Sequence, residues 1–118
     1  MKEIIIRVYV NPKNQSLDEN SMWDLSKMLQ KAASHWSGVA VEKIRVQWIT
    51  LTFAFNSTDL TIEAVVPTFA GEIWDNYLSG EMRNALIEAL VEFDLLDGWM
   101  VTVGVYPVTN ASTFSRPA

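Results

Sequence analysis

The sequence has 118 residues, of which 49% are hydrophobic and 19% charged, and its net charge is −5 at pH 7. This balance excludes a disordered chain, and no apolar run reaches the roughly 18 residues that a membrane-spanning helix needs. With no cysteine and no secretory leader, the sequence predicts a single cytoplasmic domain without disulfides.

The first predicted elements are a strand, a turn and a helix. Residues 4–10 (IIIRVYV) are apolar at even positions, which predicts a strand, and Pro12 favours the turn that follows. Residues 16–38 predict a helix, because Ser16 and Glu19 have the spacing of a capping box and Gly38 favours a C-terminal stop. The buried stripe of this helix recurs at three- and four-residue steps: Met22, Leu25, Leu29, Ala32 and Trp36.

Residues 43–55 predict a strand whose apolar side chains change phase. The even positions are apolar up to Trp48, and the odd positions are apolar from Ile49 onward. Because successive strand residues point to opposite faces, the second set faces away from the first. We therefore expect either a bulge near Trp48 and Ile49, or the end of the strand and a second strand after it. The second set contains Ile49, Leu51, Phe53 and Phe55.

The second half repeats this order of elements. Residues 59–67 predict a strand closed by Pro67, residues 71–98 predict a helix, and residues 99–108 predict a last strand. Gly80 weakens the helix enough to kink it, and Gly104 within the last strand indicates a bulge or a close approach. The main stripe of this second helix consists of Leu78, Met82, Ala85, Leu86, Ala89, Leu90 and Phe93.

The two halves, residues 1–55 and 56–108, share one plan at an offset of 56 residues, and a short polar tail follows. The order β-α-β-β-α-β predicts an α+β fold, a two-layer sandwich of four main strands and two helices. Such a sheet leaves one face uncovered by helices. We expect that face to bind another copy of the chain, so the sequence predicts a homo-oligomer, a dimer or a trimer.

Two architectures have this order of elements. In a ferredoxin-like fold the second and third strands form a hairpin, for which the polar connection NSTD (residues 56–59) has a suitable length. The stretches RVQWITLTFAF and GEMRNALIEALVEF instead resemble the isomerase branch of the tautomerase superfamily. That resemblance extends over most of the chain, and it implies two β-α-β units that pair about a pseudo-twofold axis.

The resemblance also implies a catalytic group that this sequence lacks. Tautomerases use an amino-terminal proline as a general base, and this chain has Lys2 in that position. A primary α-amino group has an ordinary pKa near 8, which leaves room for weaker base chemistry. No residue of the family can be carried over to a matching position, so the early strand is interpreted as structural rather than catalytic.

Aromatic residues are the best candidates for a site. Trp36, Trp48 and Trp99 fall on apolar faces and are interpreted as core. Trp23 lies opposite the buried stripe of its helix, and exposed aromatic residues are enriched at interfaces and pockets. The candidate ligand or interface residues are Trp23, Trp74, Tyr77, Phe53 and Phe55.

Other chemistry finds little support in the sequence. His35 is the only histidine and there is no cysteine, so we expect neither a metal site nor a cofactor. Residues 59–118 contain nine acidic residues and two basic ones, which argues against nucleic-acid binding.

We expect a non-catalytic protein that binds a small apolar or aromatic ligand, or a protein partner. Two alternatives stay open. One is a tautomerase- or isomerase-like enzyme with a non-proline amino terminus, and the other is an acidic protein-interaction module.

Overall fold

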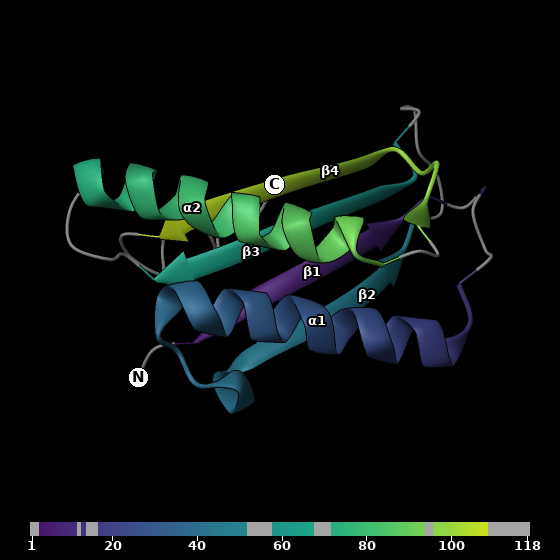
Figure 1. The fold of residues 1–118 in the computed structure, drawn as a ribbon, viewed down its shortest axis with the longest axis horizontal. Coiled ribbons are helices and arrows are strands. Elements are labelled where there is room, and N and C mark those ends of the chain that lie inside the picture. Colours follow the sequence, from purple (N-terminus) through teal and green to yellow (C-terminus); the bar gives the residue numbers. More distant parts are fainter. Residues whose placement is uncertain are drawn as a thin grey trace.

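The computed structural model describes residues 3–11, 13, 17–51, 58–67, 72–93 and 96–108. The described elements follow the predicted order, and both helices lie on one face of a single sheet (Figure 1). No described helix is long and apolar enough to cross a membrane. The elements are β1 (Ile4–Val10), α1 (Glu19–Ser37), the short 3-10 helix η1 (Val41–Lys43), β2 (Ile44–Thr50), β3 (Leu60–Pro67), α2 (Glu72–Val91) and β4 (Val101–Val108).

The strand order is β2-β1-β3-β4. Within each half the two strands are parallel, β1 with β2 and β3 with β4, as their crossover helices require. The halves meet where β1 and β3 pair antiparallel, with Ile5 opposite Val65. A ferredoxin-like hairpin would place β2 beside β3, but here β1 separates β2 from β3. The order therefore excludes the ferredoxin-like alternative and confirms the tautomerase-like arrangement.

The core lies between the sheet and the helix layer. In β1, Ile4, Ile6 and Val8 alternate with partly exposed residues, so one face of the strand is fully buried beneath the helices. The helices contribute buried residues at three- and four-residue steps, as predicted from the sequence. These are Leu25, Leu29 and Ala33 in α1 and Ser79, Met82, Leu86 and Leu90 in α2.

Trp36 is an exception to the predicted core. It is exposed near the end of α1, where it borders a groove between the two helices with Ala32 and His35. Its ring meets the imidazole of His35 edge to face, with ring centroids 5.6 Å apart. The apolar stripe of α1 contacts both the sheet and α2. The small Ala33 takes the buried position after Leu29, so Trp36 lies outside the core.

Both ends of α1 have identifiable caps. Asp18 is the N-cap, because its carboxylate accepts a hydrogen bond of 2.8 Å from the backbone N–H of Ser21. The predicted capping box at Ser16 is therefore wrong as the start of the helix, and Ser16 itself lies outside the described residues. Gly38 ends the helix at φ +73°, as expected, and its N–H bonds the carbonyl oxygen of Ser34.

Of the two alternatives for the change of phase, the bulge near Trp48 and Ile49 is absent from the described strand. β2 pairs with β1 residue for residue from Ile44 to Thr50, and the N–H of Leu51 continues the ladder to the carbonyl oxygen of Val10. The indole N–H of Trp48 donates to the Ser26 hydroxyl, which holds Trp48 on the helix side. The change of phase therefore reflects a strand with apolar residues on both faces that ends at Thr50. Residues 52–57 lie outside the described part of the chain.

The second helix is shorter than its apolar pattern predicted. α2 ends at Val91 instead of near residue 98, and it continues through Gly80 without a break. After Val91 the chain tightens, because Phe93 and Leu96 each donate a backbone hydrogen bond to the residue three positions earlier. β4 pairs with β3 without interruption, so Gly104 marks a close approach instead of a bulge. A Cβ at Gly104 would overlap the phenol ring of Tyr106.

Candidate functional site

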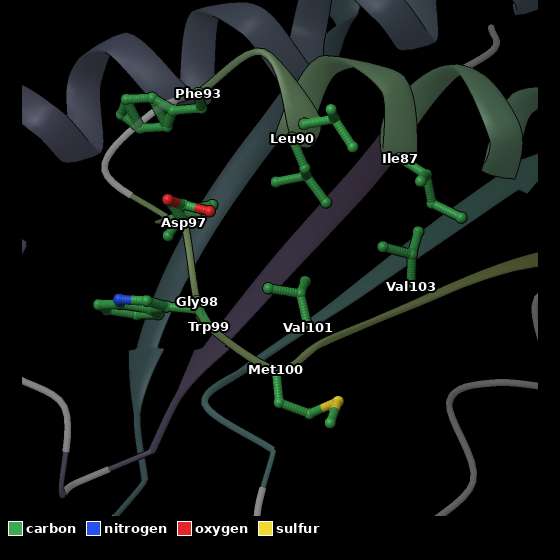
Figure 2. Close-up of a pocket in the computed structure, with 11 residues that line it drawn as sticks. Ile87, Leu90, Phe93, Asp97, Gly98, Trp99, Met100, Val101 and Val103 are labelled. Atoms are coloured by element: carbon green, nitrogen blue, oxygen red, sulfur yellow. The ribbon is translucent and has the colours of Figure 1, made fainter.

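An apolar cleft of about 700 Å³ opens between the end of α2 and the start of β4 (Figure 2). We call it the α2–β4 cleft. Figure 2 shows side chains of α2 on one side and side chains of β4 on the other, with the connecting segment closing one end. The lining residues are Ile87, Leu90, Val91, Phe93, Leu96, Asp97, Gly98, Trp99, Met100, Val101 and Val103.

Local sequence patterns place these side chains. In α2, Ile87 and Leu90 are three residues apart and therefore project from the same side of the helix. In β4, Val101 and Val103 pair with Leu60 and Ile62 of β3, whose side chains are buried in the core, so both valines face the helices.

The connecting segment turns sharply enough to form the end wall. Gly98 has a φ of +85°, a conformation that favours glycine, and the N–H of Trp99 bonds the carbonyl oxygen of Leu96. Asp59 then holds Met100 at the mouth of the cleft. Its carboxylate accepts a 2.7 Å hydrogen bond from the N–H of Met100, and its own N–H donates to the Met100 carbonyl oxygen.

The cleft combines an apolar lining with an exposed apolar rim. Ile87, Val91 and Met100 all border it and are exposed to solvent. Among the described residues that line the cleft, Asp97 alone is charged, and it is also exposed. A site of this kind offers burial to an apolar molecule, whereas acid–base chemistry needs polar groups that converge on a reacting atom.

The cleft lies at the opposite end of the sheet from the start of β1. Val10, the last residue of β1, pairs with Leu60, which in turn pairs with Val101 at the cleft. Ile4 is six residues back along β1, which corresponds to about 20 Å of strand. Chemistry at the start of β1 and binding in the cleft would therefore be separate events in one chain.

The structure separates the candidate residues predicted from the sequence. Trp23 and Tyr77 are both exposed, as expected, but they lie in the second turns of two helices that run in opposite directions (Figure 1). Neither lines the α2–β4 cleft. Phe53, Phe55 and the side chain of Trp74 lie outside the described parts of the chain.

Sequence reasoning missed the residues that form the cleft. Phe93 and Trp99 were assigned to the core, and the structure places both half-buried against it while they also line the cleft. The sequence feature that could have indicated the cleft is the run of apolar residues that continues from the end of α2 into β4. A pattern of this kind does not distinguish a filled core from a groove.

Some charged groups in the described residues have structural roles. Arg7 and Glu63 sit directly opposite each other in β1 and β3 and form an ion pair at 3.7 Å on the sheet face away from the helices. The hydrogen bond from the Ser21 N–H lowers the pKa of Asp18 below its ordinary value. The described residues contain no cluster of three or more histidine, aspartate or glutamate side chains that could hold a metal ion.

Comparisons identify similar folds among solved structures. No protein-family model matches the chain, and no curated protein matches its sequence. The Q0 fused 4-OT, described as a symmetric trimer, superposes with a TM-score of 0.61 at 17% identity over 95% of this chain and 99% of that one.

Two further structures have the same arrangement. Pt0534 inactivated by 2-oxo-3-pentynoate has a TM-score of 0.57 at 18% identity, over 88% of this chain and 85% of that one. MIF2 of Leishmania major has a TM-score of 0.59 at 11% identity, over 92% and 91% of the two chains. These are tautomerase-superfamily structures, so the chain has a tautomerase-like architecture.

Proposed function

We propose that this protein is a non-catalytic binding protein that takes a small, uncharged apolar ligand in the α2–β4 cleft. The observation that carries the proposal is an apolar cleft whose rim also presents Ile87 and Val91 to solvent. Covering such a surface releases roughly 25 cal/mol for each Å² of apolar area removed from water. The free energy of a bound ligand would therefore come mainly from burial.

The size and charge of the cleft narrow the class of ligand. Its volume of about 700 Å³ is within the common range of small-molecule sites. Asp97 places a negative charge at the rim, in the half of the chain that carries nine acids and two bases. An anionic ligand would be repelled there, so an uncharged molecule with aromatic or aliphatic carbon is favoured.

An uncharged fluorescent dye tests this proposal. We expect N-phenyl-1-naphthylamine to bind with a blue-shifted, saturable emission. Ile87→Glu should weaken its binding by about tenfold, because a carboxylate at the rim either loses hydration or blocks the dye. Val41→Glu is the matched control, since Val41 is 41% exposed and Ile87 40%, and Val41 lies in η1, away from the cleft. Equal binding by the two variants would refute the site.

We further propose that the protein is a homo-oligomer, a dimer or a trimer. None of the described helices lies on the sheet face that carries Ile5, Arg7 and Tyr9 (Figure 1). The structurally similar Q0 fused 4-OT is described as a symmetric trimer. Sedimentation equilibrium of the full chain would give the subunit number, and a monomer at tens of micromolar would exclude this proposal.

The fold supports a tautomerase- or isomerase-like enzyme as a second candidate. Pt0534, which has the same arrangement of elements, was inactivated by 2-oxo-3-pentynoate. Incubating the full chain with that compound and measuring the intact mass tests for a reactive nucleophile. A stoichiometric adduct at the amino terminus would favour an enzyme, whereas an unchanged mass would favour the non-catalytic binding protein.

A further inference from the structure

A second hollow, separate from the α2–β4 cleft, lies between the first half of α2 and the second half of β4. It has a volume of about 450 Å³. β4 is an edge strand of the sheet, so the hollow opens at the side of the molecule rather than into the core. We call it the Arg83 hollow. It is lined by Ser79, Gly80, Arg83, Val103, Gly104, Val105, Tyr106 and Pro107.

Ser79 brings a buried hydroxyl to this hollow. It lies on the buried stripe of α2 one turn before Met82, and only 8% of its surface is exposed. Its Oγ has no hydrogen-bond partner among the described residues, although serine can donate one hydrogen bond and accept two. A buried hydroxyl without a partner is unfavourable, so Ser79 has a donor available for a bound group.

Arg83 adds the positive charge. It follows Ser79 by four residues, which places the two side chains on the same side of α2 about 6 Å apart at their Cβ atoms. The residues three and four positions from Arg83 are Ser79, Gly80, Leu86 and Ile87, so no acid on its own helix is spaced to pair with it. Only two basic residues occur in residues 59–118, and Arg83 is one of them.

We propose that the Arg83 hollow binds the carboxylate of a small organic acid, with the Arg83 guanidinium and the Ser79 hydroxyl as donors. A guanidinium bonds a carboxylate through two parallel N–H groups, which suits one arginine and one monoanion. The remaining lining on the helix side of β4, formed by Val103, Val105 and Pro107, suits an apolar or aromatic body. A phosphate dianion fits less well, because the surrounding half of the chain is strongly acidic.

This site is independent of the proposed function. The α2–β4 cleft has a carboxylate at its rim and favours uncharged ligands, whereas the Arg83 hollow has a guanidinium and a free hydroxyl donor. Of the residues that the structure describes, Val103 alone lines both. A ligand of either site can therefore be located by which other residues respond.

Titration of the ¹⁵N-labelled full chain with sodium benzoate, followed by amide chemical shifts at constant ionic strength, tests the inference. We expect saturable shifts at residues 79–83 and 104–106. Arg83→Gln should weaken benzoate binding by about tenfold. Arg83→Lys should weaken it less, because a lysine keeps the positive charge but lacks the two parallel N–H donors of the guanidinium. Ser79→Ala should weaken binding by roughly threefold and leave the melting temperature unchanged or higher, since it removes an unpaired buried hydroxyl.

Arg45→Gln is the matched control. It removes the same charge from β2, at the other edge of the sheet, where Arg45 is exposed and pairs with Glu3 at 3.2 Å. Equal loss of affinity in Arg45→Gln and Arg83→Gln would show that only net charge matters, and would overturn the inference. So would shifts confined to residues 96–101, which would place benzoate in the α2–β4 cleft, or equal affinity for inorganic phosphate.

Discussion

Truncating Leu86 should destabilise the protein more than truncating Leu90, although both leucines lie on the buried stripe of α2. Leu86 is completely buried, whereas Leu90 is 7% exposed and lines the α2–β4 cleft. Leu→Ala removes three carbon atoms, and their transfer accounts for about 2.4 kcal/mol at either position. At Leu86 an enclosed cavity remains, which adds about 1 kcal/mol, whereas at Leu90 the new space joins an open cleft.

We therefore expect Leu86→Ala to cost about 3.5 kcal/mol and Leu90→Ala about 2.4 kcal/mol of the free energy of unfolding. Urea unfolding followed by circular dichroism measures both costs. Similar slopes for the two variants would show that they unfold over the same surface. The measurements belong at one protein concentration, because an oligomer gains stability with concentration. A cost at Leu90 equal to or above that at Leu86 would refute the reasoning, since it would mean that no open cleft reaches Leu90.

The remaining predictions concern α1. The lowered pKa of Asp18 means that its carboxylate stabilises the folded state above the ordinary pKa near 3.8, and this contribution is lost as the pH falls through the lower folded value. Asp18→Asn should flatten the acid limb of the stability–pH profile, and an unchanged limb would contradict the cap. Ser26→Ala should cost about 1–2 kcal/mol, because the Trp48 indole N–H, 2.7 Å from the Ser26 hydroxyl, loses its acceptor. The same substitution in a Trp48→Phe background should cost less, as a double-mutant cycle measures.

Periodicity predicted the elements because burial imposes it. β1 alternates between buried and partly exposed residues from Ile4 to Tyr9, and the stripe of α2 from Met82 to Leu90 recurs at helical steps, so each pattern indicated the buried face of its element. The end of α2 was harder to predict, since the apolar pattern continues past Val91 into a turn. The predicted start of α1 at Ser16 was wrong because the structure uses the carboxylate of Asp18, and aspartate caps helices as well as serine does.

Strand order was beyond the sequence pattern because it depends on contacts between distant residues. Ile5 pairs with Val65 across the two halves, and nothing in the periodicity of either strand names its neighbour. The hairpin of the ferredoxin-like alternative would satisfy the same alternation. The pairing of β1 with β3 joins the two β-α-β units, and only the three-dimensional structure identifies it.

The candidate site escaped prediction because exposed aromatic residues are a poor guide to concave surfaces. Trp23 and Tyr77 are exposed on helix faces, and they lie at opposite ends of the helix layer because the two helices run in opposite directions. The α2–β4 cleft is formed instead by residues such as Leu90 and Val101 that read as core. The cleft forms because α2 ends at Val91 and the connecting segment turns at Gly98 before β4 begins. The space between the end of the helix and the start of β4 is therefore left unfilled. A tautomerase-like sheet with helices on one face thus leaves space along its β4 edge, and the binding functions proposed for this protein both use that edge.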